Sequence, residues 1–386
     1  MHYYGRRCGV KCDIIIPVWN QLESTSECID ALVKSTGYPY RLILIDNGSD
    51  AGTKSYLEEI KDRGSPEVLL IRNEKNLGYV KAVNQGLRVS DAPYVCLMNN
   101  DTVPGAGWLE KLVAFAQDHK EVGLMNPLCN GHLDLSIDEY ARAVGKNSGR
   151  YMEMNQCFGF CTLIKREVME KIGYLDETFG IGGYDDTDYS MKAGKAGYRS
   201  ASVHSSYVYH KEHVSFRAAG KKDSFTLKAQ QEYLKKWPRH LRIGVSFFVD
   251  DSVDDVEIEN MLKGILFLAR EWCWINFWVF GEEAKNKDRI DAIAGKIGMP
   301  LHQNIKYNFM PQKFANLQTL VRLVERAFGT KRRKKYDAIF VDNKKTESFL
   351  NIFYPIHTTK VVLVSPETWG DMQSWKKSLS QAGRVS

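Results

Sequence analysis

Short apolar runs recur along the first part of the chain, and longer amphipathic stretches separate them. The expected strands are CDIIIPVWN, YRLILIDNGSD, VLLIRN and YVCLMNND, and the expected helices are STSECIDALVKST, with a Ser or Thr cap, AGTKSYLEEIKDR and GYVKAVNQGLRVS. Near-continuous Ile, Leu and Val runs that alternate with helices are typical of parallel strands buried on both faces. We therefore expect an α/β fold with a mostly parallel central sheet.

A second alternating pattern begins near residue 240. Pro238 is expected to end a helix, and the expected elements that follow are the strands LRIGVSFFVDD, INFWVFG, YDAIFVDN and KVVLVSPE and the helices VEIENMLKGILFLARE and FANLQTLVRLVERAF. The predicted organisation is a domain of residues 1–239 followed by a Rossmann-like α/β domain of residues 240–386. The second part contains neither G-x-G-x-x-G nor G-x-x-x-x-G-K-S, so its role is left open.

Composition and charge narrow the class of protein. The 386 residues suit two domains, and 44% hydrophobic with 26% charged residues is typical of a globular chain. The net charge of +6 mildly favours anionic partners. The basic run KRRKK, residues 331 to 335, is either a solvated segment or a contact for an anionic lipid or polysaccharide.

No strongly apolar leader precedes CDIIIPVWN, and Arg270 and Glu271 interrupt the most apolar later stretch. We therefore expect a cytoplasmic protein, with any membrane association peripheral. Cysteines in such a protein are expected to be reduced. Two C-x-x-x-C pairs end at Cys12 and Cys161, and a four-thiolate zinc site is the alternative. It is disfavoured because structural zinc usually takes tighter C-x-x-C pairs. Alternation along CFGFCTLIK places Cys157 and Cys161 on one face of a strand.

Polar residues follow the expected strands of the first domain. In an open α/β sheet, ligands bind beyond the carboxyl ends of the strands. Asp46 stands at one such end, where it could accept a hydrogen bond from a base or ribose, or only cap a turn. Asn99, Asn100 and Asp101 stand at another, where they could hold Mg²⁺ or Mn²⁺ against a diphosphate, or form an ordinary Asn/Asp turn.

An acidic cluster lies in GGYDDTDYSMKAGKAGYR, where Asp185, Asp186 and Asp188 follow two glycines and precede a helix. One of them could act as a general base. The alternative is stabilisation of a helix N-terminus, which needs one or two carboxylates rather than three. Three histidines follow in SVHSSYVYHKEHVSF, and a single histidine is more often structural than a ligand.

Taken together, these stretches resemble the inverting family 2 glycosyltransferases of GT-A fold, especially the rhamnosyltransferase-like branch. The resemblance covers about residues 11 to 216, through IIIPVWN, IDNGSDAGT, NEKNLGYVKAVNQG, NNDTVPGAGWLEKL, FGFCTLIKREVMEKIGYLDETF, YDDTDYSMKAGKAGY and VYHKEHVSF in that order. Each motif is weak, whereas the ordered set is specific. It implies a hexosyltransferase of polysaccharide biosynthesis that moves a sugar from a UDP- or dTDP-sugar to a hydroxyl of a glycan or lipid-linked acceptor, with no nucleic acid partner.

The resemblance also implies roles for individual residues. Asp46 is similar to the carboxylate that reads the nucleotide base. The other residues expected to bind the donor nucleotide are Pro17, Trp19, Asn20, Asn47, Asn76, Lys81, Asn100 and Asp101. Asp101 matches the last carboxylate of a D-x-D-like motif, which bridges a divalent cation, Mn²⁺ or Mg²⁺, to the diphosphate, and His210 can complete that metal site. Asp186 matches the catalytic base, with Asp185 and Asp188 beside it.

Two departures from the family pattern affect these roles. The metal motif reads NND, so one carboxylate, a histidine and two phosphates must hold the cation. The base motif carries Asp185 where many relatives carry Glu, which leaves the choice between two carboxylates open. A nucleotidyltransferase should carry a Gly-rich, basic loop directly after the first strand. The stretch there, VWNQLESTSE, contains neither Gly nor Lys, so this class is disfavoured. A non-catalytic nucleotide-sugar or polysaccharide-binding protein that uses the same pocket stays an alternative.

Overall fold

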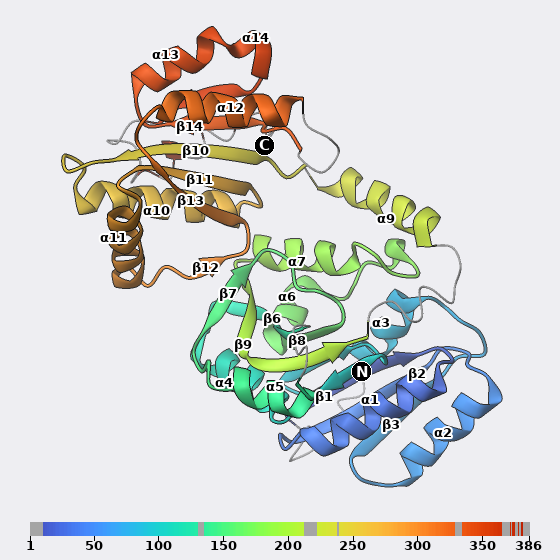
Figure 1. The fold of residues 1–386 in the computed structure, drawn as a ribbon. Coiled ribbons are helices and arrows are strands. Elements are labelled where there is room, and N and C mark those ends of the chain that lie inside the picture. The colour runs from blue at the N-terminus through green and yellow to red at the C-terminus, as the bar shows by residue number, and fades with distance from the viewer. Residues whose placement is uncertain are drawn as a thin grey trace. The chain divides into compact units, whose positions relative to one another are not determined.

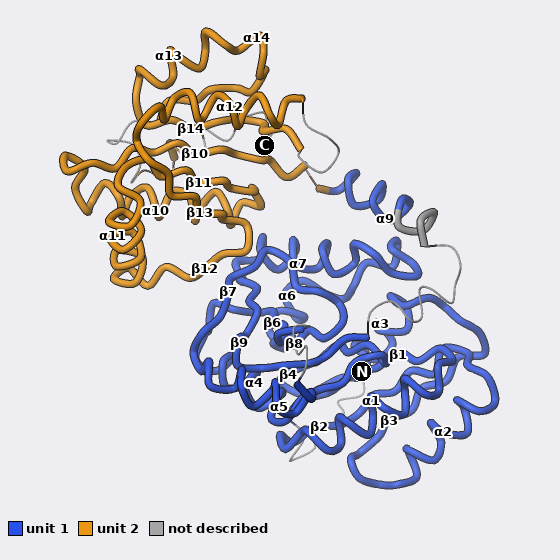
Figure 2. Tube along the Cα trace, viewed as in Figure 1, with its two compact units in different colours: residues 1–236 blue, residues 237–386 orange. Residues whose placement is uncertain are grey.

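The computed structural model describes residues 11–129, 135–211, 222–237, 239–328 and 334–364, together with a few positions between 371 and 380. Cys8, His213 and residues 331–333 lie outside these ranges. The chain divides into two compact units, Met1–Lys236 and Trp237–Ser386, which Figure 2 colours separately. Each unit is described by itself below.

Unit 1 alternates strands and helices through most of its length (Figure 1). Its strands are β1 (Cys12–Val18), β2 (Tyr40–Asp46), β3 (Glu67–Arg72), β4 (Tyr94–Met98), β5 (Thr102–Pro104), β6 (Val122–Leu128), β7 (Tyr151–Met154), β8 (Cys161–Lys165) and β9 (Arg199–His210). Its helices are α1 (Leu22–Ser35), α2 (Ala51–Asp62), α3 (Tyr79–Val89), α4 (Trp108–Asp118), α5 (Ile137–Val144), α6 (Arg166–Ile172), the 3₁₀ turn η1 (Glu177–Phe179), α7 (Asp185–Lys195) and α9 (Lys222–Lys236).

The strands of unit 1 form a sheet in the order β7-β9-β6-β8-β4-β1-β2-β3. β3, β2, β1 and β4 are parallel, and in their register Ile15 lies opposite Ile43 and Leu97. β8 runs antiparallel between β4 and β6, and β7 runs antiparallel to β9, whereas β6 and β9 are parallel to each other. The expected α/β class with a mostly parallel central sheet is confirmed.

Helices cover both faces of this sheet. Side chains of α1, α2 and α4 join Ile14 and Ile16 of β1 in one apolar core. On the other face α3 approaches β1 at Gly86, where an added Cβ would lie 2.6 Å from Cγ2 of Ile15. Glycine at this position therefore allows the close contact that fixes α3 against the sheet.

Two local expectations are wrong. α1 begins at Leu22 after Gln21, which has a left-handed backbone (φ 61) and makes no side-chain cap, so the expected Ser or Thr cap is absent. Cys157 lies in the loop before β8, and Cys161 alone of the two is in the strand, because a turn at Gly159 separates them. The cysteines of the described ranges are free thiols, and these ranges hold no group of three or more His, Cys, Asp or Glu side chains suited to a metal.

Unit 2 is a second α/β unit with its own sheet. Its strands are β10 (Arg242–Val249), β11 (Trp274–Gly281), β12 (Leu301–His302), β13 (Ile305–Pro311), β14 (Ala338–Val341) and β15 (Lys360–Leu363). Its helices are α10 (Asp255–Arg270), α11 (Glu283–Lys296), α12 (Ala315–Ala327), α13 (Lys344–Ile352) and α14 (Tyr354–His357). The sequence pattern did not predict α11, β12, β13, α13 or α14.

The sheet of unit 2 has the order β13-β11-β10-β14-β15 with every pair parallel. Numbered within the sheet, this is the order 3-2-1-4-5 of the first five strands of a Rossmann sheet. One apolar core joins β10 to α10 and α11, and another joins Trp278 and Ile339 to α12 and α13, so helices cover both faces. Within the described ranges of both units, no helix has the length and apolar character needed to cross a bilayer.

Candidate active site

Asp46 ends β2 at the carboxyl edge of the unit 1 sheet, and its side chain is fully buried. One carboxylate oxygen accepts the backbone N–H of Ser49 at 2.9 Å, and the other accepts Nε of Arg72 at 2.9 Å. Asp46 therefore holds its own turn and the end of β3. A nucleotide base would have to share one of these oxygens, and the base-reading role of Asp46 stays a prediction.

Asn47 links this turn to the loop before α3. Its amide nitrogen donates to Oδ1 of Asn76 at 2.9 Å and to the carbonyl of Gly78 at 3.3 Å. Gly48 has φ +79, and an added Cβ would lie 2.6 Å from the backbone of Lys75. The structure thus brings Asn47 and Asn76, both predicted donor-binding residues, into direct contact.

Three further predicted donor residues lie at the carboxyl end of β1. Asn20 adopts a left-handed backbone (φ 56), and its N–H donates to Oγ of Ser49 at 2.9 Å. This bond ties the end of β1 to the turn that follows β2. Pro17 and Trp19 are partly exposed beside it. The turns after β1 and β2 are therefore joined by hydrogen bonds, and the donor-binding role of these three residues stays a prediction.

Two predicted donor residues face elsewhere. Asn100 is buried, and its amide donates to Oγ1 of Thr25 at 2.9 Å, which anchors α1. Lys81 is exposed on α3. Hydrogen bonds from Arg88 and Asn84 lower the pKa of Glu177, and the nearby charge of Lys81 lowers it further. The structure does not bring Lys81 to Asp46 or Asn47.

Asp101 and His210 form the candidate metal site. β5 pairs antiparallel with β9, with Thr102 opposite His210, and this register places Nε2 of His210 3.2 Å from Oδ1 of Asp101. Nε2 is buried and has no hydrogen-bond partner among the described residues. A buried ring nitrogen beside a carboxylate oxygen fits a divalent cation that accepts both ligand types. The remaining ligands would have to come from water and a diphosphate.

Asp186 lies in the first turn of α7. Its Oδ2 accepts the N–H of Gly159 at 3.1 Å, and its Oδ1 accepts the N–H of Thr187 at 2.7 Å. Burial raises the pKa of Asp186 against the lowering effect of these bonds. The neighbouring Asp185 accepts the N–H of Gly183 at 2.7 Å, and burial with the charge of Asp186 raises its pKa too. A carboxylate with a raised pKa suits general-base chemistry.

Asp188 has a different environment from Asp185 and Asp186. Its buried carboxylate lies 2.7 Å from Nζ of Lys192 and 3.1 Å from Nζ of Lys236. The pair with Lys192 lies within α7, and the pair with Lys236 connects α7 to α9 at the end of unit 1. Because both ammonium groups already engage this carboxylate, the structure favours a structural role for Asp188.

Tyr79 and the turn at Gly159–Phe160 are parts of the site that the sequence reasoning missed. The Tyr79 hydroxyl donates to the carbonyl of Gly159 at 3.4 Å. Burial raises the pKa of Tyr79, and the nearby charges of Asp185, Asp186 and Asp101 raise it further. The Phe160 ring stacks on the His210 ring with centroids 5.4 Å apart. The turn therefore lies between Asp186 and the Asp101–His210 pair. In the sequence, the FGFC motif was the feature that could have pointed to this turn.

Comparisons with known proteins identify the domain. Residues 13–173 match the family described as Glycosyl transferase family 2. Glycosyltransferase AglE of Haloferax volcanii is 25% identical over 202 residues, which are 50% of this chain and 64% of AglE. The uncharacterized glycosyltransferase YwdF of Bacillus subtilis is 23% identical over 246 residues, which are 59% of this chain and 82% of YwdF. Unit 1 thus carries a family 2 glycosyltransferase domain, as the ordered motifs predict.

Two further similarities are to an enzyme and to a solved structure. The undecaprenyl-phosphate 4-deoxy-4-formamido-L-arabinose transferase of Proteus mirabilis is 29% identical over 115 residues, 29% of this chain and 35% of that protein. The crystal structure of GalNAc-T7 with UDP, GalNAc and Mn²⁺ aligns at 16% identity and a TM-score of 0.49, over 74% of this chain and 55% of that chain. The chain spans less than two thirds of the length of AglE and of the Proteus enzyme. Membership of the rhamnosyltransferase-like branch stays an expectation from the sequence.

Proposed function

We propose that this chain is an inverting hexosyltransferase that moves a sugar from a UDP- or dTDP-sugar to a hydroxyl of a glycan or lipid-linked acceptor. The observation that carries the proposal is the turn at Gly159–Phe160. Asp186 accepts a hydrogen bond from Gly159, and Phe160 stacks on His210, which lies beside Asp101. A candidate base and a candidate metal pair thus lie on either side of one short turn.

The proposed reaction is a single in-line displacement. Asp186 accepts the proton of the acceptor hydroxyl, and that oxygen forms a bond to the anomeric carbon. The bond from the anomeric carbon to the diphosphate oxygen breaks, its electron pair leaves with the diphosphate, and the anomeric configuration inverts. Asp101 and His210 would hold a divalent cation, Mn²⁺ or Mg²⁺, which supplies charge neutralisation to the leaving diphosphate.

The donor nucleotide is proposed to bind along the polar edge of the sheet. Asp46, Asn47 and Asn76 lie there, and the loops that carry them are held together by side-chain hydrogen bonds. Such pre-formed loops lose little conformational freedom when a ligand binds. A preference for uracil or thymine would come from Asp46 if its carboxylate accepts the ring N–H of these bases, a donor that adenine and cytosine lack. We place the enzyme in polysaccharide biosynthesis in the cytoplasm, with peripheral membrane association.

Donor-dependent release of nucleoside diphosphate tests this function. A thermal-shift panel of nucleotide sugars with and without Mn²⁺ first identifies the donor, because a ligand that binds the folded state raises its stability. Nucleoside diphosphate should then be released far faster when a hydroxyl acceptor is added. A donor that shifts the melting temperature but is never turned over with any acceptor would favour a non-catalytic binding protein instead.

A further inference from the structure

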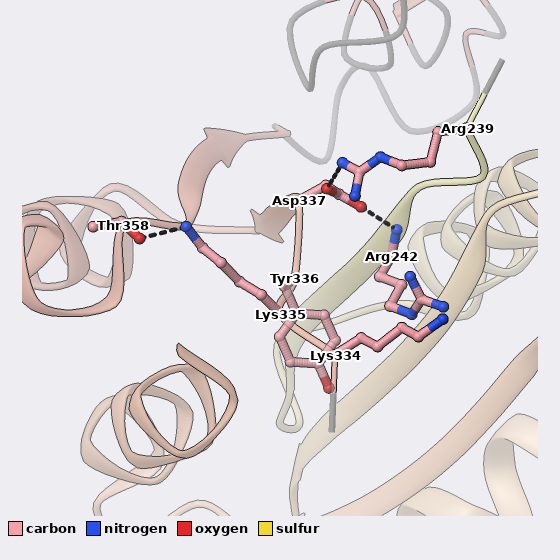
Figure 3. Close-up of a pocket in the computed structure, with 7 residues that line it drawn as sticks. All are labelled: Arg239, Arg242, Lys334, Lys335, Tyr336, Asp337 and Thr358. Carbon is pink, nitrogen blue, oxygen red and sulfur yellow. Dashed lines mark hydrogen bonds and ion pairs between the residues drawn. The ribbon is translucent and has the colours of Figure 1, made fainter. Parts of the chain in front are cut away.

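A basic hollow lies in unit 2, and none of the unit 1 site residues assigned above lines it (Figure 3). Its volume is about 550 Å³, within the range of small-molecule sites. The polar side chains that line it are those of Arg239, Arg242, Lys334, Lys335, Asp337 and Thr358. Four of these six side chains are cationic, and one is anionic.

The hollow lies at the amino-terminal ends of β10 and β14. Ile243 pairs with Ala338 in the parallel register, so Arg242 and Asp337 immediately precede the paired residues. The N–H of Asp337 donates to the carbonyl of Arg242 at 2.8 Å, which fixes the two chain segments side by side. Nucleotides in Rossmann sheets bind at the opposite, carboxyl edge. The hollow is therefore not the ordinary cofactor crevice of this fold.

The single carboxylate does not balance the cations around it. Asp337 pairs with Arg239, and its other oxygen accepts the backbone N–H of Arg242 at 2.7 Å. Lys335 donates to Thr358, which is neutral. Among the described residues, neither the guanidinium of Arg242 nor the ammonium of Lys334 has a hydrogen-bond or ion-pair partner. At least two positive charges thus face the hollow, and Asp337 acts on that of Arg242 without forming a side-chain ion pair with it.

A further cation increases this excess. Arg326 stacks on the ring of Tyr336, 4.6 Å from its centroid, and donates to the carbonyl of Lys334 at 3.1 Å. Burial lowers the pKa of Arg242, and the charges of Arg239 and Arg326 lower it further against the opposite effect of Asp337. Like charges held this close repel one another, and a bound anion would relieve that repulsion.

We propose that this hollow binds a phosphate group, supplied by a soluble phosphate ester or by a lipid headgroup. A guanidinium presents a planar fork that matches two phosphate oxygens, and ammonium groups add point charges around it. A phosphate monoester or diphosphate carries enough charge to neutralise both Arg242 and Lys334, whereas a sugar carboxylate carries one charge. Arg242 and Lys334 both line this one hollow, which suits a single phosphate group. This site is independent of the glycosyltransferase function proposed above.

Calorimetric titration of the full chain with inorganic phosphate and pyrophosphate tests the proposal. EDTA in the buffer removes the metal-dependent diphosphate binding expected in unit 1. The double variant Arg242→Gln/Lys334→Gln should bind both anions at least tenfold more weakly, and higher salt should weaken binding by the wild type. The matched control is Lys287→Gln/Lys296→Gln, which removes two exposed charges from α11 of the same unit and should bind as the wild type does.

Equal affinity of the wild type and the Arg242→Gln/Lys334→Gln variant would overturn the proposal, and so would an absence of phosphate binding to the wild type at millimolar concentration. Tighter binding of oligogalacturonate than of pyrophosphate would also contradict it. If the double variant melts at a lower temperature than the wild type, Lys334→Gln alone repeats the comparison, because Lys334 is exposed.

Two further ligands distinguish the sources of the phosphate. Glucose 1-phosphate represents a soluble ester, and phosphatidylcholine vesicles with phosphatidic acid represent a headgroup. If either ligand binds the wild type and binding requires Arg242 and Lys334, the site is supported and that ligand identifies the source of the phosphate. Vesicle binding that survives in the double variant would assign membrane attraction to other basic residues and contradict the headgroup arm.

Discussion

Nε2 of His210 lies 3.2 Å from Oδ1 of Asp101, although the two residues are far apart in the sequence. The pairing of β5 with β9 produces this contact, and the N–H of Lys211 donates to the carbonyl of Asp101 at 3.0 Å to hold the register. A short strand thus brings together a carboxylate and an imidazole at the carboxyl edge of the sheet, where the leaving diphosphate is expected.

The first prediction concerns this pair. Asp101→Ala should abolish the Mn²⁺ dependence of donor binding without unfolding the chain, because the carboxylate is the one anionic ligand the pair supplies. His210→Ala should weaken that dependence at least tenfold. His204→Ala on the same strand is the matched control and should leave it intact. Titrations of the donor with and without Mn²⁺ measure the effect. Unchanged metal dependence in Asp101→Ala would contradict a metal site at this pair.

The second prediction concerns the base. UDP and dTDP should bind better than ADP and CDP by about 1–3 kcal/mol, the contribution of a hydrogen bond from the ring N–H of the base to a charged group. Asp46→Asn should reduce this preference. Arg72→Gln is the matched control, because it breaks the same ion pair yet keeps the carboxylate, so the preference should persist. Equal affinity for the four nucleotides would leave Asp46 with only its role in the turn.

The third prediction follows from the raised pKa of Asp185. Its folded-state pKa lies above the value in the unfolded chain, so the ionised carboxylate destabilises the fold as pH rises through the folded pKa. Asp185→Asn should therefore raise the free energy of unfolding at pH 8 by at least about 1.4 kcal/mol, the equivalent of one pKa unit. The gain should shrink as the pH falls toward 4, because the folded carboxylate is then protonated and the unfolded one approaches its own ordinary pKa.

Asp188→Asn is the control for that measurement on the same helix. It removes a buried carboxylate that faces Lys192 and Lys236, so it should destabilise the protein at pH 8. The expected loss is on the order of 1–3 kcal/mol, since both lysines are partly exposed and water can solvate their charges. Melting curves of the two variants from pH 4 to pH 8 provide the comparison. A stabilised Asp188→Asn, or an Asp185→Asn that melts lower than the wild type at pH 8, would contradict these environments.

The fourth prediction concerns the units. A chain that ends at Lys236 should fold cooperatively and bind the donor, because Lys236 pairs with Asp188 in unit 1. The sequence placed the end of this domain at Arg239, whose partner Asp337 belongs to unit 2. Thermal melting followed by circular dichroism and donor titration check the shortened chain. An insoluble or non-cooperative product would mean that the units share a core.

Elements with strong local patterns were predictable from the sequence. β2 and β4 are near-continuous apolar runs, and α10 carries a regular apolar stripe, so pattern alone located them. β13 was missed because most of its side chains are only partly buried, which leaves no apolar run to recognise. α11 was missed because its sequence is mostly polar. Weak burial on an outer element therefore limits what the pattern can show.

The candidate site was predictable in its residues but not in its contacts. The motifs singled out Asp101, His210 and Asp186, yet the register that joins the first two depends on β5, a strand of three residues. The difference between Asp186 and Asp188 depends on Lys236, which comes from a helix much later in the chain. Pairings between distant segments leave no local signal in a single sequence.

The most direct test of the account is the transfer rate of Asp186→Asn. Asn keeps the size and much of the hydrogen bonding of Asp but cannot accept the acceptor's proton, so transfer should fall by about 10²–10⁴-fold while donor affinity barely changes. Asp185→Asn is the matched neighbour and should retain most of the activity. An active Asp186→Asn beside an inactive Asp185→Asn would move the base by one residue, and full activity in both variants would contradict general-base catalysis by this helix.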